Sequence, residues 1–248
     1  MKKLVKLHFI GAWLILSFAL ILFSQPVQAY VYDDFTSSGI VASLWVDVGP
    51  NTGLLSQPGD GYLYFNDSSG SQADILRSYS RINGAFFVSI QYSDFQAIND
   101  TQAGLGMGST VALRLEDGSN YSYLSEYKNN GGLGHRAFSV IGGTRTFLNY
   151  VALTNVNSGW LGMYYNGILG AGGEVDFWYD SGAGWTLLDS CAPNFSEAPY
   201  FSVAGSDLFG SSLSFRVAQV QVTPIPTGAL LMGSGLLGLA GLRRFRKL

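Results

Sequence analysis

Two carboxylates stand two residues apart in Glu174-Val175-Asp176, within a stretch that is rich in aromatic residues. On a β-strand, residues at i and i+2 lie on the same face. Retaining hydrolysis of a glycosidic bond uses two carboxyl groups about 5–5.5 Å apart. In this chain the next carboxylate is Asp180, six residues after Glu174, so no third carboxylate follows close to this pair. We therefore expect the chain to contain no catalytic residues and not to be an enzyme.

Four tryptophans are candidate carbohydrate-binding residues. Their rings are rigid and amphipathic, so they could stack on pyranose rings while Asn and Asp side chains bond the hydroxyl groups. The alternative is that they belong to the core or form cross-strand pairs, as aromatic residues in sandwiches commonly do. The candidates are Trp45, Trp160, Trp178 and Trp185.

Residues that bind transition metals are scarce. After the N-terminal segment the chain has one histidine, His135, and one cysteine, Cys191, so neither a disulfide within the chain nor a cluster of His and Cys ligands is expected. We interpret Cys191 as a small, half-buried side chain. Four carboxylates in predicted turns could hold Ca²⁺ together with carbonyl oxygens, although they lack EF-hand spacing and exposed turn residues are the alternative. They are Asp67, Asp94, Asp100 and Asp117.

The central part of the chain is acidic. Residues 30–222 contain all 17 Asp and Glu but only seven Lys and Arg, which gives a net charge of −10 against −3 for the whole chain. Such a surface argues against nucleic acid and anionic lipid as partners. About 190 residues are enough for one domain with a substantial core.

The same part of the chain carries a β pattern. Short runs rich in Val, Ile, Phe, Tyr and Trp alternate with turn signals such as Asn83-Gly84 and Ser181-Gly182. We predict an all-β fold for residues 30–222, an antiparallel two-sheet sandwich or jelly roll. The predicted strands are 61–65, 75–80, 85–92, 103–115, 121–128, 135–141, 145–150, 160–166, 174–179, 184–189, 200–204 and 212–222.

The N-terminal segment has the order of a secretory signal peptide. Lys2, Lys3 and Lys6 form a basic region, residues 9–23 are apolar, and Val27-Gln28-Ala29 carries small residues before a cleavage point. We predict cleavage after Ala29; an uncleaved anchor is the alternative.

The C-terminal segment, residues 223–248, reads as a membrane-held tail. Pro224-Ile225-Pro226 is followed by 16 uncharged residues, 227–242, and then by a basic cluster that begins with Arg243 and Arg244. A spanning helix needs roughly 17–25 apolar residues, and the flanking residues bring this segment to the lower end of that range. The basic cluster predicts a cytoplasmic end.

This tail resembles the PEP-CTERM sorting signal of Gram-negative bacteria that produce exopolysaccharide. Pro224 and Pro226 match the two prolines of that signal, Ile225 replaces its usual Glu, and Arg243-Arg244 matches its basic end. The resemblance implies a precursor held temporarily at the inner membrane, processing by an exosortase, and a final place at the cell surface or in the extracellular matrix.

The central part has a weaker resemblance to concanavalin A-like sandwich domains. It is carried by Asp33-Asp34-Phe35, Trp45, the run 59–65 and the segment 175–188. Laminarinase-like glycosidases of that fold carry Glu-x-Asp-x-Glu, or a version with one more residue, which Glu174-Val175-Asp176 matches only in part.

Three hypotheses follow. We favour an exported, non-catalytic sandwich of the cell surface or exopolysaccharide matrix that acts as a structural or carbohydrate-contacting module, with no required cofactor. The alternatives are a secreted glycoside hydrolase with a divergent site, and an adhesin that binds a protein through an exposed sheet face.

Overall fold

The computed structural model describes residues 28–49, 54–67, 73–97, 101–108, 120–129, 132–142, 144–153, 157–207 and 213–225. The chain divides into a compact body, Ala29–Pro224, and a second unit made of the two terminal segments. The predicted signal peptide (apart from Gln28 and Ala29), the predicted span 227–242, and Pro226, Arg243 and Arg244 lie outside the described residues. Among the residues that are described, no helix is long and apolar enough to cross a membrane.

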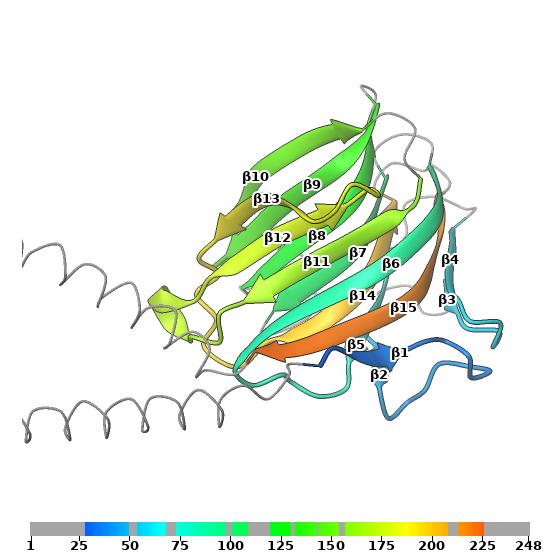
Figure 1. The fold of residues 1–248 in the computed structure, drawn as a ribbon, viewed down its shortest axis with the longest axis horizontal. Coiled ribbons are helices and arrows are strands. Elements are labelled where there is room, and N and C mark those ends of the chain that lie inside the picture. Colours follow the sequence, from blue (N-terminus) through cyan, green and yellow to red (C-terminus); the bar gives the residue numbers. More distant parts are fainter. Residues whose placement is uncertain are drawn as a thin grey trace, which may run out of the picture. The chain divides into compact units, whose positions relative to one another are not determined.

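The body consists of two antiparallel sheets. Sheet A has the strand order β13-β12-β11-β6-β15-β4-β3, with β1 paired to β15 (Figure 1). Its strands are β1 (Tyr30–Asp33), β3 (Leu55–Ser56), β4 (Leu63–Asp67), β6 (Ala85–Ala97), β11 (Gly159–Tyr165), β12 (Val175–Asp180), β13 (Thr186–Cys191) and β15 (Leu213–Ile225). A single 3-10 turn, η1 (Gly170–Gly172), precedes β12.

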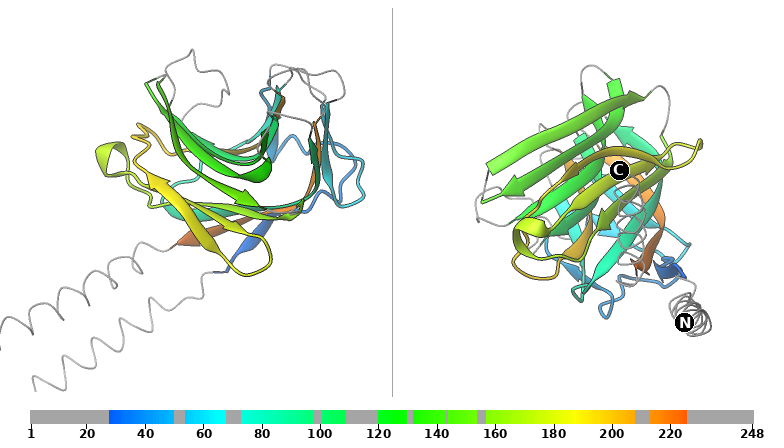
Figure 2. Two further views of the ribbon diagram at one scale, coloured as in Figure 1. Left: turned by 90° about the horizontal axis from the view of Figure 1, so that it is seen from above. Right: turned by 60° about the vertical axis from the view of Figure 1, so that its left-hand side comes forward.

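Sheet B has the order β10-β9-β8-β7-β14-β5-β2. It lies behind sheet A in Figure 1, and the view from above in Figure 2 shows the two sheets as stacked, curved layers. Its strands are β2 (Trp45–Asp47), β5 (Ala73–Ser78), β7 (Thr101–Gly108), β8 (Tyr121–Asn129), β9 (Gly132–Ile141), β10 (Thr144–Leu153) and β14 (Tyr200–Asp207). The predicted antiparallel two-sheet sandwich is therefore confirmed.

The core lies between the sheets, and strands such as β6 direct alternate apolar side chains into it. Val88 and Ile90 of β6 and Met163 of β11 are fully buried, and Phe201 and Val203 face them from β14. Burying one such side chain contributes roughly 1.5–3 kcal/mol. The polar residues between them, including those of β11 and β12, are thereby directed to the outer face of each sheet.

The alternation of apolar and polar residues along β15 holds only in its first half. Leu213, Phe215 and Val217 are buried as expected, but the next buried residue is Val220 rather than Gln219. This three-residue step places both Ala218 and Gln219 outside the core, as an extra residue in a strand does. Strict alternation would place Val220 on the polar face, whereas it is buried.

The Asp33-Asp34-Phe35 motif ties the first strand to the core. Asp33 is buried; its Oδ1 accepts a hydrogen bond from the backbone N–H of Phe35 (2.8 Å) and its Oδ2 accepts one from the indole N–H of Trp45 (2.6 Å). Phe35 has φ of 55°, a conformation that non-glycine residues seldom adopt, and its ring is fully buried. The carboxylate thus fixes both the turn and the tryptophan.

A second buried carboxylate, Asp74, joins β5 to the segment that precedes β3. Its Oδ2 accepts hydrogen bonds from the backbone N–H groups of Leu54 and Leu55, both 3.0 Å long. Burial raises the pKa of Asp74 to about 6, and the charge of neighbouring Asp47 acts in the same direction. Asp74 therefore holds a proton at mildly acidic pH more readily than an ordinary aspartate.

Candidate functional site

The four predicted tryptophans do not share one environment. Trp45 is 2 % exposed, bonds Asp33, and packs edge-on against Tyr32 and Phe201. It is a core residue and is not available to a ligand. Trp160, Trp178 and Trp185 instead lie on the outer face of sheet A or fold over it.

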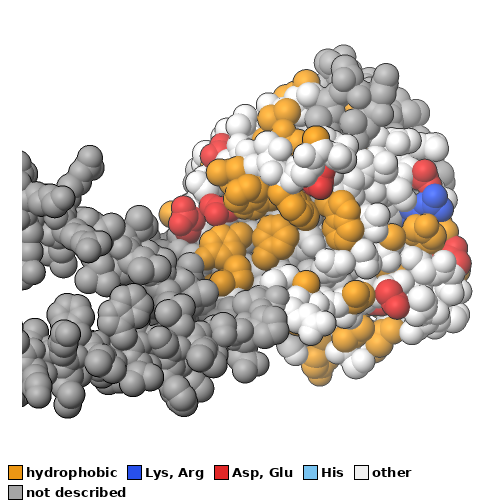
Figure 3. Space-filling model, viewed as in Figure 1, with side chains coloured by type: hydrophobic (Ala, Val, Ile, Leu, Met, Phe, Trp, Pro, Cys, Tyr) orange, Lys and Arg blue, Asp and Glu red, His pale blue; other side chains and the backbone are white. Residues whose placement is uncertain are grey.

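Strand register arranges the outer face of sheet A in rows. Trp160 of β11 is paired with Gln91 of β6 on one side and with Asp180 of β12 on the other. In the next row, Gly162 lies between Ser89 and Trp178. Figure 3 shows hydrophobic side chains gathered in a band across this face of the body.

Trp185 folds back over this face from the turn between β12 and β13. Its ring is 5.2 Å from Phe87, edge to face, and 6.4 Å from Trp160. Gly162 makes room for it: a β-carbon there would lie 2.3 Å from Phe87 Cζ and 2.9 Å from Trp185 Cζ3. Trp185 remains 43 % exposed, so one surface of its ring faces solvent.

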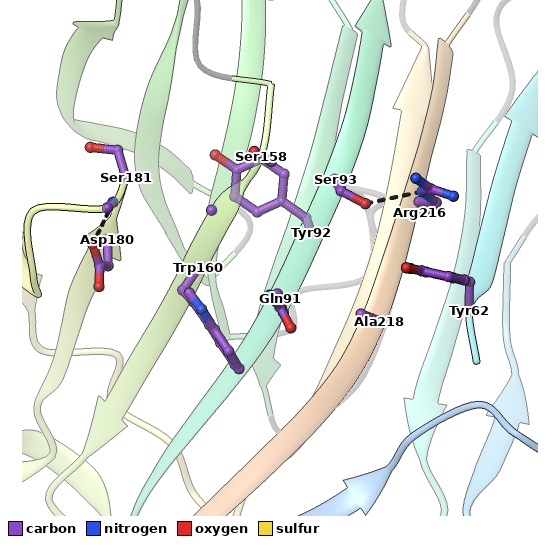
Figure 4. A pocket seen from close by; sticks show the side chains of 12 residues that line it. Tyr62, Gln91, Tyr92, Ser93, Ser158, Trp160, Asp180, Ser181, Arg216 and Ala218 are labelled. Atoms are coloured by element: carbon purple, nitrogen blue, oxygen red, sulfur yellow. Dashed lines mark hydrogen bonds between the residues drawn. The ribbon is translucent and has the colours of Figure 1, made fainter.

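A pocket of about 510 Å³ begins beside Trp160 and crosses β6 and β15, and we call it the outer groove. In Figure 4, Trp160 and Tyr62 flank the groove, and Gln91 and Ala218 lie on the strands between them. Its lining consists of Tyr62, Gln91, Tyr92, Ser93, Ser158, Gly159, Trp160, Asp180, Ser181, Gly182, Arg216 and Ala218.

Arg216 is held rigidly at the Tyr62 side of the groove. Its Nη2 forms an ion pair with Asp94, its Nε donates to Ser93 Oγ (3.1 Å), and its guanidinium lies 4.4 Å from the centre of the Tyr62 ring. Asp94 has φ of 54°, so its backbone takes an unusual conformation where it meets Arg216. These contacts fix the orientation of Tyr62 before any ligand binds.

Asp180 closes the opposite side. Its Oδ1 accepts the backbone N–H groups of Gly182 (2.7 Å) and Gly184 (2.9 Å), which folds the turn that carries Trp185. Both glycines have positive φ, 106° and 102°, as such a tight turn requires. Among the described groups, none donates to Asp180 Oδ2, so this oxygen can accept a ligand hydroxyl.

The incomplete acidic motif lies outside the groove. Glu174 precedes β12, and Asp176 lies on the outer face of sheet A opposite Tyr164. Burial raises the pKa of Asp176, and the charge of Glu174 raises it further. Asp176 is four residues along β12 from Asp180, about 13 Å at the rise of a strand. Glu174 and Asp176 therefore do not lie beside Trp160 in the structure.

Cys191 and His135 lie between the sheets. The Cys191 thiol is 3.4 Å from Ser122 Oγ, and burial raises its pKa to about 11. Such a thiol is a weak nucleophile at neutral pH. His135 is fully buried, with its ring 4.5 Å from that of Tyr179.

No group of three or more potential metal ligands is found within the described ranges. Asp94, one of the four carboxylates considered for Ca²⁺, is paired with Arg216. Asp67 ends β4 with its side chain outside the described part, and Asp100 and Asp117 also fall outside it. The calcium hypothesis for these residues stays a prediction.

Two residues of the predicted sorting signal belong to the body's last strand. β15 continues beyond Val222, the expected end of the domain, and includes Pro224 and Ile225. Tyr30 of β1 pairs with Val222. The predicted cleavage point after Ala29 and the beginning of the predicted tail therefore lie on two paired strands.

Comparison with known proteins finds similarity at the level of the fold. No family model matches the chain, and the search of curated proteins also found no match. Similar solved structures include a functionally unknown protein from Saccharomyces cerevisiae (12 % identity, 74 % of this chain and 98 % of that chain, TM-score 0.57). A xylan β-1,4-xylosidase from Bacillus halodurans is similar at 14 % identity (77 % and 38 %, TM-score 0.59). A legume lectin-like domain from Entamoeba histolytica is similar at 12 % (74 % and 91 %, TM-score 0.52).

These similarities overturn the prediction that the chain is not an enzyme. Several of the similar structures are GH43 proteins, one of them described as a glycoside hydrolase, so the same sandwich occurs within enzymes and the incomplete acidic motif does not exclude one. The chain spans 27–40 % of the length of the GH43 chains it matches. At 12–14 % identity the similarity shows the fold alone.

Sequence reasoning identified Trp160 but missed the rest of the groove. Gln91 lies on β6, Arg216 on β15 and Tyr62 just before β4, so these residues are far apart in the chain and only the strand order brings them together. One signal was present: Tyr62 and Tyr64 flank the buried Leu63, so both rings had to lie on the outer face.

Proposed function

We propose that the body is a glycan-contacting β-sandwich and that its ligand lies in the outer groove. One observation carries the proposal: two aromatic rings, Trp160 and Tyr62, stand on either side of a floor made by Gln91 and Ala218. Aromatic walls with a few fixed polar groups are the usual composition of a small-molecule site. The lectin-like and xylosidase structures of the same fold support a sugar as the ligand.

Each part of the groove has a role in this binding. The rings offer flat apolar surfaces to the C–H faces of sugars. Asp180 Oδ2 and Gln91 form hydrogen bonds with sugar hydroxyl groups. Arg216 donates to the sugar through the N–H groups that do not contact Asp94 or Ser93. Because Arg216 and Asp180 are already fixed by their own hydrogen bonds, little side-chain entropy is lost on binding.

A glycan array probed with the full chain tests the proposal. The chain is kept in a detergent without a sugar headgroup, so that the detergent does not compete. Trp160→Ala should weaken binding to any positive glycan by about tenfold or more. Phe147→Ala is the control, since Phe147 is an exposed aromatic residue, 60 % exposed, on sheet B. Equal binding by both variants, or no bound glycan, contradicts the proposal.

We also propose that the two ends direct export and sorting. The signal-peptide pattern of residues 1–29 and the order Pro-Ile-Pro, apolar segment, basic cluster in 223–248 support an exosortase and, transiently, the inner membrane as partners. The cell surface or exopolysaccharide matrix is the proposed destination.

Deletion of residues 226–248 tests the sorting proposal. The deletion starts at Pro226 because β15 includes Ile225, so the sandwich keeps its last strand. We expect loss of C-terminal processing and of surface retention, measured by mass spectrometry and cell fractionation. Unchanged processing and location would refute the role of the tail.

A further inference from the structure

The two rings of the outer groove are too far apart for a monosaccharide to contact both. Trp160 lies on β11 and Tyr62 immediately precedes β4, with β6 and β15 between them. Three strand spacings of about 4.8 Å separate the two sides by about 14 Å. A sugar ring in van der Waals contact with one side, at about 4 Å, leaves the other side empty. A ligand that uses both rings is therefore a chain that crosses the strands.

The floor of the groove is open in that direction. Ala218 is the residue of β15 that lies between Gln91 and Tyr62, and it has no side chain beyond its β-carbon (Figure 4). Alternation after the buried Val217 places it on the outer face, and the three-residue step to Val220 places Gln219 there as well. Gln219 donates to Gln91 Oε1 (3.4 Å), so these two side chains are joined to one another across β6 and β15. Described residues of β6 and β15 line one continuous pocket that reaches from Trp160 to Tyr62.

The charges of this face indicate the kind of sugar. Arg216 is neutralised by Asp94, and Asp180 adds a negative charge on the other side. Glu174 and Asp176 stand further along the same face. Among the described side chains of this face, Arg216 is the one cation. A uronate or sulfate group would thus be repelled by a net negative surface, whereas uncharged hydroxyl groups would not be repelled.

We infer that the outer groove binds a neutral oligosaccharide that runs across the strands of sheet A and stacks on Trp160 and Tyr62 at once. This inference rests on the glycan-binding function proposed above. It adds the charge class of the ligand, its minimum extent and its direction across the sheet.

Titration calorimetry with β-1,4-linked xylose and glucose oligomers, from the monosaccharide to the hexasaccharide, tests the extent. Affinity should rise with length and stop rising once both rings are occupied. Tyr62→Ala and Trp160→Ala should each weaken hexasaccharide binding by about tenfold. Ala218→Phe should block long oligomers, because its ring would stand on the floor between the two sides, and the folded state is unaffected since Ala218 lies outside the core.

Oligogalacturonides of matched length test the charge. They should bind at least about tenfold more weakly than neutral chains. Asp94→Asn removes the carboxylate that neutralises Arg216, and asparagine tolerates the positive φ at this position. The difference in affinity between acidic and neutral chains should therefore become smaller in this variant. Tighter binding of the acidic chain, or a monosaccharide as strong as the hexasaccharide, overturns this inference but leaves glycan binding intact. Absence of binding to every oligomer overturns the proposed function itself.

Discussion

Replacing Asp33 with alanine is expected to lower the free energy of unfolding of the sandwich by about 4 kcal/mol. Asp33 is 7 % exposed and accepts hydrogen bonds from the Phe35 backbone N–H (2.8 Å) and the Trp45 indole N–H (2.6 Å). Alanine would leave both buried donors without an acceptor. Each unsatisfied donor costs about 1–3 kcal/mol, and two of them give the stated magnitude.

Urea unfolding followed by circular dichroism measures this loss of stability. An unchanged dependence of the free energy of unfolding on urea concentration would show that the variant unfolds between the same native and unfolded states as the wild type. In a domain of this size the melting temperature should fall by about 8–16 °C. Asp34→Ala is the matched control. Asp34 also accepts two hydrogen bonds, from the Thr36 N–H (3.2 Å) and hydroxyl (2.7 Å), but it is exposed and water can replace its carboxylate. Its loss should stay within about 0.5 kcal/mol.

Equal losses in the Asp33 and Asp34 variants would refute the reasoning, because the two residues differ in burial and not in the number of bonds. The free energy of unfolding of the Asp33→Asn variant should lie between those of the wild type and of Asp33→Ala. Asparagine keeps one acceptor oxygen but directs an NH₂ group at one of the two donors.

Three further predictions concern other parts of the body. With a folded pKa of about 6 at Asp74, the native state binds more protons than the unfolded state between about pH 4 and 6, so stability should fall by up to about 3 kcal/mol as pH rises through that window. Asp74→Asn should flatten this slope in melts at several pH values. Gly162→Ala should displace Trp185 and cost about 1–3 kcal/mol, seen as a changed near-ultraviolet dichroism spectrum. Cys191, with a pKa of about 11, should react with a thiol reagent at pH 8 only after unfolding, since about one thiol in a thousand is ionised there.

The long strands could be predicted from the sequence because each has a local signal. Runs of aromatic and β-branched residues between Asn-Gly or Gly-Gly turns placed twelve strands that correspond to β4–β15. The three missed strands, β1 to β3, have only two to four residues each. A strand that short contains at most two residues on one face, so it has no measurable period. Their positions are instead fixed by side-chain bonds such as that of Asp33 to Trp45.

The groove could not be predicted because its residues depend on tertiary features. Trp45 and Trp160 are alike as residues, yet one is in the core and the other is on the outer face, according to which strand face each occupies. Ala218 follows from simple alternation after the buried Val217, but Gln219 lies beside it only because β15 takes a three-residue step to Val220. A period of two cannot encode such a step, because strict alternation places Val220 on the outer face and Gln219 in the core.

One strand joins the two proposed functions. β15 contributes Arg216 and Ala218 to the outer groove and ends in Pro224 and Ile225, the first residues of the proposed sorting signal. From Ala218 to Pro224 the strand advances six residues, about 20 Å at 3.4 Å per residue. This is about two and a half times the Debye length of about 8 Å at physiological salt, so anionic headgroups at the point of attachment would be largely screened from the groove. A tail that holds the end of β15 at a membrane therefore leaves the groove able to bind a neutral chain, and glycan affinity should be the same before and after the tail is removed.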